Sequence, residues 1–590
     1  MIQTAVCSIL LLVWAGVVQV SECATRSSGS EDKVRFAWNK LLSSDELSWT
    51  KCYENRECAK LKVPLDYANP EKASASIALI RLRSKVSPHS SAYRGPILIN
   101  PGGPGVSGVD FIRGAYGDIL ALILGPNFDI VSFDPRGIRR STPVASFFDT
   151  AAERALWLPS IRKYSLNASA NAVAAAWARG TILGQLAGER DYDGSLRFIN
   201  TENTARDMLQ IVEAHGREKL SYWGFSYGTV LGATFAAMFP DKIERMVIDG
   251  VVNSNSFYAG DWTDSLLDAD TAWQSFAEDC VAAGPSRCAF YAPTTAEISS
   301  SIQAIYTRLR QRPIPVRGKT SYGLVDFSML REVIFLAVYA PYIIFPQLAP
   351  ALASLAEGDG TALFELDARY GLHPFECNCD NEDAEPPDEL SQEGFWAVFC
   401  NDAERIPAGY DEFFKDYQGI LAVSELADMI EPLRAGCVAW PDYPKTNFRG
   451  PFVANTSFPL LILGNTADPV TPLASAKKMS EGFAGSVVLT QNCVGYYLQQ
   501  HTTISVPSLC THKHLRAYFQ DGKLPEPGIV CEVEAEVFPL PDSELDHRGS
   551  AQRVMRVPKA RLAQLSAEDR QLVDRLSELA TSVLDLMHPL

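Results

Sequence analysis

The chain has 590 residues, of which 47% are hydrophobic and 21% are charged, and its formal net charge is −17. This length exceeds what one compact core usually holds, so we expect a core with a large insertion or two domains. The acidic surface repels nucleic acid and anionic membranes, which argues against a function in nucleic-acid binding or at a membrane.

The N-terminal residues predict a secretory signal. An apolar run from Ala5 to Val20 ends in small and polar residues, and it falls short of the roughly 20 residues that a comfortable membrane span needs. We expect cleavage near Cys23 or Ala24, which makes residues 1–23 the signal peptide and the protein secreted. An uncleaved anchor is the alternative.

The cysteines fit an oxidising compartment, in which most of them are expected to pair. Of the 13 cysteines, Cys7 and Cys23 lie in the signal segment. Among the others, local spacing favours the pairs Cys52–Cys58, Cys280–Cys288, Cys400–Cys437 and Cys510–Cys531. The sequence alone does not fix the connectivity, and an odd number leaves one cysteine over.

Two further patterns concern metals and glycans. Cys377 and Cys379 are separated by one residue, and neither a second close pair nor a histidine cluster completes a zinc site. We therefore expect no metal. Two Asn-x-Ser/Thr triplets, at Asn167 and Asn455, are candidate glycosylation sites of a secreted protein.

Strand and helix patterns alternate along the first part of the chain. We expect strands over 58–67, 75–84, 95–100, 127–134, 219–224 and 244–250, and helices over 204–216 and 227–239. From the third strand onward, this alternation indicates an α/β fold with a mostly parallel sheet that helices cover on both faces.

The pattern changes near residue 255. Helical segments dominate up to about 450, and strand patterns resume over 458–465 and 486–491. The simplest organisation is a core that a mostly helical cap interrupts. It gives the ranges 24–254 for the first part of the core, 255–450 for the cap, 451–535 for the second part of the core and 536–590 for a C-terminal tail. The tail contains an amphipathic helix pattern and either packs on the core or hangs free.

The strongest chemical signal is the stretch Gly224-Phe225-Ser226-Tyr227-Gly228, which follows a strand pattern and opens a helix pattern. In this context G-x-S-x-G forms a nucleophile elbow, which exposes the serine above the end of the sheet. The glycines allow the sharp turn because they have no Cβ. We expect Ser226 to be the nucleophile, and an ordinary tight strand–helix turn is the alternative.

A glycine-rich stretch, Asn100-Pro101-Gly102-Gly103-Pro104-Gly105, follows an earlier strand pattern. Glycines here let main-chain N–H groups approach a ligand. In an acyl-transfer enzyme, one such N–H and the N–H of Tyr227 would bind the developing oxyanion. We favour Gly103 over Gly102 for this role, and a plain glycine turn is the alternative.

The acid and the base of a triad are expected after the serine, in that order. Asp468 lies just past a strand pattern in Gly464-Asn-Thr-Ala-Asp-Pro-Val-Thr-Pro, where an acid that orients an imidazole belongs. Asp249, at the end of the strand after the elbow, is the rival acid. Of the eight histidines, His501 lies in a loop after the last core strand and before the final core helix. We therefore expect His501 to be the base.

Together these motifs resemble secreted α/β-hydrolase peptidases of the tripeptidyl-aminopeptidase and prolyl-aminopeptidase type, with the C-terminal domain of the former. The resemblance covers most of residues 50–535 and rests on the stretches VPLDY (63–67), NPGGPGVSG (100–108), FDPRGIRRSTP (133–143), GFSYG (224–228), GNTADPVTP (464–472) and PSLCTHKHLRAYFQDGKLPEPGIVCE (507–532). It implies an α/β-hydrolase fold, a Ser226–Asp468–His501 triad and removal of short units from a free peptide N-terminus.

Two departures from the family pattern stand out. Relatives have histidine directly after the Val-Gly pair, whereas here Val494-Gly495 is followed by Tyr-Tyr-Leu-Gln-Gln before His501. This is either a real loop extension or a gene-model error. Pro101 also replaces a histidine that is common in prolyl aminopeptidases, a change that the tripeptidyl type tolerates.

The resulting hypothesis is a secreted serine exopeptidase that acts on peptides, needs no cofactor and uses an acyl-enzyme. A carboxylesterase with the same triad is one alternative, since seryl acyl chemistry does not separate an ester from an amide. An inactive hydrolase fold that serves as a binding protein is the other alternative.

Overall fold

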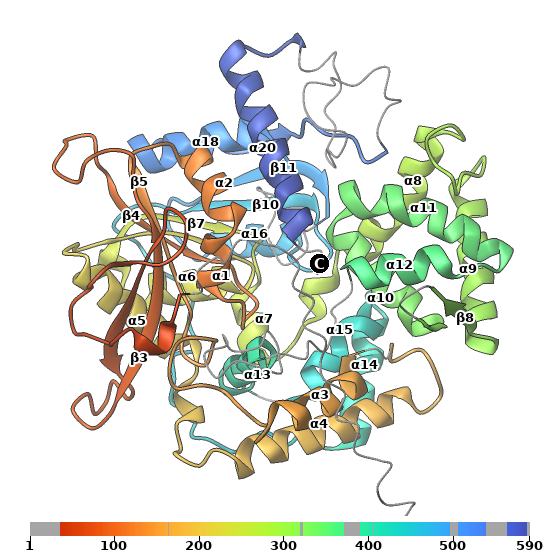
Figure 1. Ribbon diagram of the computed structural model, residues 1–590, viewed down its shortest axis with the longest axis horizontal. Coiled ribbons are helices and arrows are strands. Elements are labelled where there is room, and N and C mark those ends of the chain that lie inside the picture. Colours follow the sequence, from red (N-terminus) through yellow and green to blue (C-terminus); the bar gives the residue numbers. More distant parts are fainter. Residues whose placement is uncertain are drawn as a thin grey trace, which may run out of the picture. The chain divides into compact units, whose positions relative to one another are not determined.

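The computed structural model describes residues 36–162, 165–318, 322–370, 390–404, 406–495, 506–538 and 563–586. The chain divides into two units, Met1–Ala37 and Trp38–Leu590, and the description below concerns the second. Its centre is a sheet for which the described residues supply ten strands, in the order β1-β2-β3-β5-β4-β6-β7-β10-β11-β12 (Figure 1).

The sheet is antiparallel at one edge and parallel elsewhere, as the sequence predicts for an α/β core. The antiparallel strands are β1 (Thr50–Lys51), β2 (Glu57–Pro64) and β3 (Ser74–Leu82), and β3 also pairs antiparallel with β5. The parallel strands are β5 (Phe128–Phe133), β4 (Gly95–Asn100), β6 (Leu220–Phe225), β7 (Ile243–Asp249), β10 (Leu461–Ala467), β11 (Val487–Val494) and β12 (Val530–Glu532). Every residue of β5 and β6 is buried because helices cover both faces.

Two groups of helices lie against these strands. In the first, α2 contacts α1, β5, α18 and α20; in the second, α5 packs on α6, which lies against β6 and β7, and α16 lies against β10 and β11. The bounds are α1 (Gly108–Arg113), α2 (Ala115–Leu124), α5 (Thr201–Ala214), α6 (Tyr227–Met238), α16 (Leu473–Ser480), α18 (Leu509–Asp521) and α20 (Ala567–Leu586). The tail therefore packs on the core through α20, and Lys513 of α18 pairs with Asp569 at 2.8 Å.

Helices dominate between β7 and β10, which is the stretch where the sequence predicts a cap. They are α7 (Ser254–Ala259), α8 (Ala269–Ala283), α9 (Thr295–Gln311), α10 (Phe327–Tyr339), α11 (Pro341–Glu357), α12 (Thr361–Tyr370), α13 (Leu390–Asp402), α14 (Tyr410–Leu421) and α15 (Ala427–Ala435). The hairpin of β8 (Ile314–Arg317) and β9 (Tyr322–Val325) lies among them.

Two helices from earlier in the chain join this helical region. They are α3 (Ala151–Arg162) and α4 (Ala172–Glu189), and α4 packs against α14 and α15 (Figure 1). The Trp177 indole N–H donates to the carbonyl of Ala408 at 3.0 Å, and Arg154 forms an ion pair with Glu393. The helical region is thus built from two separate stretches of sequence.

All four disulfides expected from local spacing are present: Cys52–Cys58, Cys280–Cys288, Cys400–Cys437 and Cys510–Cys531. Among the described cysteines, Cys493 is free and buried. Cys377 and Cys379 lie outside the described residues.

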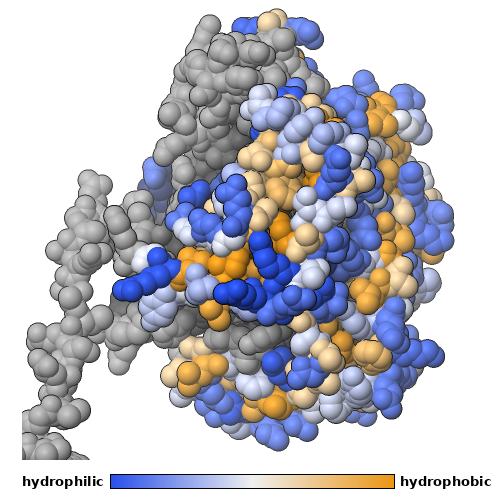
Figure 2. Space-filling view, turned by 90° about the vertical axis from the view of Figure 1, so that its right-hand side faces the viewer, coloured by the Kyte–Doolittle hydropathy of each residue, from blue (hydrophilic) through white to orange (hydrophobic). Residues whose placement is uncertain are grey.

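Figure 2 faces the side on which the helices α8 to α12 gather, and it shows hydrophilic and hydrophobic residues interspersed over that surface. Tyr322 and Leu324 of β9 are among the exposed apolar side chains, at 84% and 60% exposure. None of the helices that the structure describes combines the length and the apolar character needed to cross a membrane.

The close approach of α4 to α15 generates a prediction about Gly180. A Cβ at Gly180 would lie 1.9 Å from the carbonyl oxygen of Ala435, whereas one at Gly419 of α14 would meet nothing within 4 Å. We expect Gly180→Ala to lower the free energy of unfolding by about 1–3 kcal/mol through overpacking. Gly419→Ala should instead raise it by about 0.5–1 kcal/mol, because glycine is the poorer helix former. Urea denaturation of both variants checks this, and equal effects would contradict the packing described.

Candidate active site

Ser226 lies at the junction between β6 and α6, in a backbone conformation that few serines adopt. Its φ is 52° and its ψ is −122°, and α6 begins at the next residue. Such a conformation costs on the order of 1–3 kcal/mol and persists only where the surroundings impose it. The Ser226 N–H donates to the carbonyl of Asp249 at 3.1 Å, and the Ser226 carbonyl accepts from the hydroxyl of Thr229 at 2.5 Å. This is the geometry of a nucleophile elbow.

The glycines on either side of the serine are needed for close packing. A Cβ at Gly224 would lie 2.4 Å from the carbonyl oxygen of Gly228, and a Cβ at Gly228 would lie 2.7 Å from the carbonyl oxygen of Asn100. The strand, the helix and the end of β4 therefore approach one another more closely than any side chain permits. The sharp turn that the G-x-S-x-G pattern predicts follows from this packing.

The glycine-rich loop after β4 lies directly against the elbow. Gly102 has a φ of +98°, and a Cβ there would lie 2.5 Å from the carbonyl oxygen of Phe225 and 2.9 Å from the Cβ of Ser226. The Gly102 N–H donates to the side-chain oxygen of Asn100 at 3.0 Å. The next residue, Gly103, also has a positive φ of +107°. The loop thus brings main-chain groups beside the serine, as the sequence leads us to expect.

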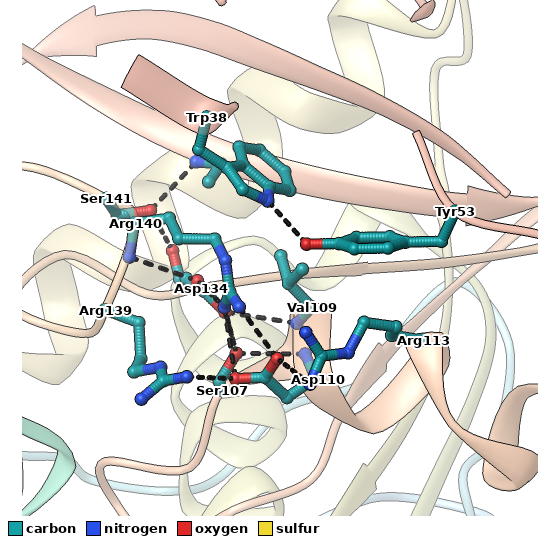
Figure 3. A network of polar contacts seen from close by, with 11 residues as sticks. Trp38, Tyr53, Ser107, Val109, Asp110, Arg113, Asp134, Arg139, Arg140 and Ser141 are labelled. Atoms are coloured by element: carbon teal, nitrogen blue, oxygen red, sulfur yellow. Dashed lines mark hydrogen bonds and ion pairs between the residues drawn. The ribbon is translucent and has the colours of Figure 1, made fainter. Parts of the chain in front are cut away.

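A buried ionic network holds the far end of this loop (Figure 3). The hydroxyl of Ser107 and the N–H of Val109 both donate to one oxygen of Asp134, at 2.5 and 3.1 Å. The backbone N–H of Arg140 donates to the other oxygen, and its guanidinium pairs with Asp110 at 2.8 Å. Because Ser107 also caps α1, the network fixes the point where the loop ends and the helix begins.

Sequence reasoning did not assign this network. The stretch FDPRGIRRSTP that carries Asp134 and Arg140 served only as a family motif. The sequence does contain a signal for such a network. An acidic residue directly follows a buried strand, and two adjacent arginines come within the next six residues. Val109 and Ser107 lie 25 and 27 positions upstream of Asp134, so the contacts themselves are not visible in the sequence.

Asp468 follows β10 and is completely buried. One carboxylate oxygen accepts the N–H groups of Val470 and Thr471 at 3.0 and 2.7 Å, which fixes the side chain. The other oxygen has no hydrogen-bond partner among the described residues. Burial raises the pKa of Asp468 to about 8. The second oxygen thus lacks the donor that would stabilise the charged form of Asp468, and an imidazole N–H is the donor that a triad supplies.

The topology places Ser226 and Asp468 on the same side of the sheet, where the carboxyl ends of its parallel strands lie. Strand β7 alone separates β6 from β10, and all three run parallel. Neighbouring strands lie about 4.8 Å apart, so the two backbones are about 10 Å apart, a span that one imidazole side chain bridges.

His501 lies outside the described residues, as does the five-residue insertion before it. The last described residue before this segment, Gly495, donates its N–H to the carbonyl of Ala467 at 2.9 Å, and its own carbonyl accepts from Asn465 at 2.9 Å. The chain that leads to His501 therefore departs from beside Asp468.

The rival acid, Asp249, lies at the end of β7 between the elbow strand and β10. One of its carboxylate oxygens accepts the indole N–H of Trp223 at 3.1 Å, and its backbone carbonyl holds Ser226. These contacts tie Asp249 to the base of the elbow.

One group of potential metal ligands lies among the described residues. His514 lies close to Cys510 and Cys531, with the three ligand atoms within 4.8 Å of one another. Those two sulfurs form a disulfide with each other and so do not act as thiolate ligands. The cluster is therefore a disulfide with a neighbouring histidine.

Two protein-family models match separate parts of the chain. The model described as alpha/beta hydrolase fold matches residues 95–286, and the one described as TAP-like protein matches residues 427–531. The first range holds the glycine-rich loop and the elbow, and the second holds Asp468. The chain therefore has the α/β-hydrolase fold, and residues 427–531 form a TAP-like region.

The chain is also similar to curated proteins with three different names. Serine protease Hip1 of Mycobacterium tuberculosis is 26% identical over 555 residues, which cover 88% of this chain and 98% of that protein. Tripeptidyl aminopeptidase of Streptomyces lividans is 27% identical over 496 residues, which cover 82% of this chain and 85% of that protein. Carboxylesterase B of Mycobacterium tuberculosis is 28% identical over 501 residues, which cover 82% of this chain and 89% of that protein.

The contact between the glycine loop and the elbow predicts the effect of one methyl group. Gly102→Ala places a Cβ against Phe225 and Ser226, so we expect about a 100-fold loss in the rate at which a fluorophosphonate probe labels the protein, through displacement of the serine. Gly194→Ala is the matched control, since Gly194 also has a positive φ of +68° but meets nothing within 4 Å. Normal labelling of Gly102→Ala, or equal losses in both variants, would contradict the arrangement.

Proposed function

We propose that the chain is a secreted serine peptidase that releases short peptides or amino acids from the N-termini of peptides through a Ser226–Asp468–His501 acyl-enzyme mechanism. The observation that carries the proposal is the strained backbone of Ser226 at the junction of β6 and α6. It is supported by a buried Asp468 with one unpartnered oxygen at the same edge of the sheet. The relatives named as a serine protease and a tripeptidyl aminopeptidase support the choice of peptide substrates.

The mechanism begins with attack of the Ser226 hydroxyl on the carbonyl carbon of the scissile bond. His501 takes the hydroxyl proton, and Asp468 orients the imidazole and stabilises its charged form. The proton then passes to the leaving amine, and the N-terminal fragment remains as an ester on Ser226. Water, activated by His501, attacks that ester and releases the fragment. No cofactor takes part in these steps.

The oxyanion requires N–H donors beside Ser226. Tyr227 supplies the first, because its N–H lies at the N-terminus of α6, where the helix dipole also favours negative charge. For the second, Gly103 is the better candidate than Gly102, because the Gly102 N–H already donates to Asn100. Gly103 therefore completes the proposed oxyanion hole.

An esterase activity is the second candidate function. Carboxylesterase B is similar to this chain over 89% of its own length, and the same serine chemistry cleaves ester and amide bonds. An inactive hydrolase fold with a binding role is the remaining alternative. This alternative depends on whether His501 reaches Ser226 and Asp468.

Secretion is part of the proposal. Four disulfides are typical of an oxidising compartment. Asn167 and Asn455 are both exposed, as glycan acceptors must be. N-terminal sequencing of the mature protein tests cleavage near residue 23, and a mobility shift on glycosidase treatment tests the two sites. An intact Met1 in the protein from the medium would exclude the cleaved signal.

The decisive assay compares a tripeptide chromogenic amide with its N-acetylated counterpart, with Ser226→Ala as the control. We expect turnover of the free-amine substrate alone, because an aminopeptidase requires a free N-terminus, and no turnover by Ser226→Ala. Hydrolysis of short acyl esters but of neither amide would show an esterase. Hydrolysis of the acetylated substrate at an equal rate would contradict the aminopeptidase assignment.

The role of His501 is tested by His501→Ala and Asp468→Asn in the same assay. We expect each to lower kcat by at least about 1,000-fold, because a triad member acts only with the others in place. The double variant should have a kcat only slightly lower than that of either single variant. Losses that multiply in the double variant would show that the two residues do not belong to one triad.

A further inference from the structure

Asp402, the last residue of α13, is a buried carboxylate that has no role in the mechanism above. It is fully inaccessible to solvent, and burial raises its pKa to about 7. Its oxygens accept the backbone N–H of Thr201 at 3.2 Å, the Thr201 hydroxyl at 2.5 Å and the side-chain amide of Asn447 at 3.0 Å. The positive charges of Lys445 and Arg449 act in the opposite direction and lower the pKa of Asp402. Both of these donate instead to backbone carbonyls at the end of α13.

The Thr201 hydroxyl also contacts the hydroxyl of Tyr227, at 2.5 Å. A threonine hydroxyl has one proton to donate, and an ionised carboxylate only accepts. When Asp402 is ionised, Thr201 therefore donates to Asp402, and Tyr227 donates to Thr201. The three residues are all buried, at 3% exposure or less, and form a chain of hydrogen bonds that ends on the carboxyl group of Asp402.

Tyr227 directly follows the nucleophile, and its main-chain N–H is the proposed oxyanion donor. The tip of its side chain is tied to Thr201, and the ring packs against Phe257 of α7 with 5.6 Å between the centroids. Because the ring and the N–H belong to one residue, a fixed ring restricts rotation of the N–H. The elbow is thus supported from the interior as well as by the glycine loop.

We propose that Asp402 is a positioning residue of the enzyme, which acts through Thr201 to hold Tyr227 in the orientation that stabilises the oxyanion. The inference rests on the proposed function. Asp402, Asn447 and Phe257 all come from the residues between β7 and β10, so this helical insertion contributes to catalysis from beneath the elbow. Its contribution is therefore not limited to covering the substrate.

A purely structural role for Asp402 makes a different prediction. Asp402 also accepts the N–H of Thr201, the first residue of α5, and so completes the cap that Asn200 begins. Thr201→Val removes the hydroxyl but retains this N–H, so it breaks the chain to Tyr227 and leaves the cap intact. Thr201→Ser retains both the hydroxyl and the N–H. The pair therefore separates positioning from helix capping.

The experiment measures kcat and KM of these variants on the tripeptide amide, together with their rates of phosphonylation by a fluorophosphonate. Loss of one oxyanion donor costs about 100-fold to 1,000-fold in kcat, so a displaced donor should cost about 10-fold or more. We expect that loss in Thr201→Val, with KM within about threefold of the wild type, and near-normal kcat in Thr201→Ser. Tyr227→Phe, which deletes one oxygen, carries the same test if Thr201→Val does not fold.

The matched control is Glu393→Gln. Glu393 is also on α13 and also buried, but its partners are Arg154 and the N–H of Phe147. We expect it to change stability and not kcat. Equal kcat in folded Thr201→Val and Thr201→Ser, or an equal loss in Glu393→Gln, would overturn the inference.

The phosphonylation rates separate this inference from the proposed function. A wild type that reacts with the probe but does not cleave the amide would refute the peptidase assignment, and the variants would then be judged on phosphonylation alone. A wild type that reacts no faster than Ser226→Ala would overturn both.

Discussion

The whole site depends on holding Ser226 at a positive φ of 52°. A serine does not adopt this conformation unless its neighbours impose it, and here they approach so closely that only glycine fits beside it. Gly224, Gly228 and Gly102 each lie where a Cβ would come within 3 Å of the backbone of another segment. The end of β4, the loop after it and the start of α6 are therefore fixed relative to one another. The same approach that strains the serine also brings the proposed oxyanion donors to its side.

Outside the elbow, the site is assembled from segments far apart in the chain. The glycine loop is anchored at its far end by Asp134, and the acid is fixed by the turn that follows β10. The helical insertion reaches the elbow through α7 and α13, and the disulfide Cys400–Cys437 lies close to the end of α13. In this account the insertion and the core are one catalytic structure, since Asp402 lies only one side chain away from Tyr227.

Much of the fold and part of the candidate site could be predicted from the sequence, because the patterns that indicate them are local. Strand and helix patterns, the G-x-S-x-G turn and the four disulfides are all expressed in short stretches, and the structure confirms them. The position of Asp468 followed from the strand that precedes it. The Asp402–Thr201–Tyr227 chain was missed because Thr201 and Asp402 are 201 positions apart, and nothing local distinguishes either residue. The contact of α4 with α14 and α15 was missed for the same reason. The role of His501 stays a prediction, because it lies outside the described residues.

The central claim is that Ser226 is an activated nucleophile. The most direct measurement is to treat the oxidised, folded protein with a fluorophosphonate and locate the adduct by peptide mass spectrometry. The account predicts a single adduct, on the peptide that contains Ser226, and none in Ser226→Ala. An adduct on a different residue, or no adduct on protein with its four disulfides intact, would contradict it.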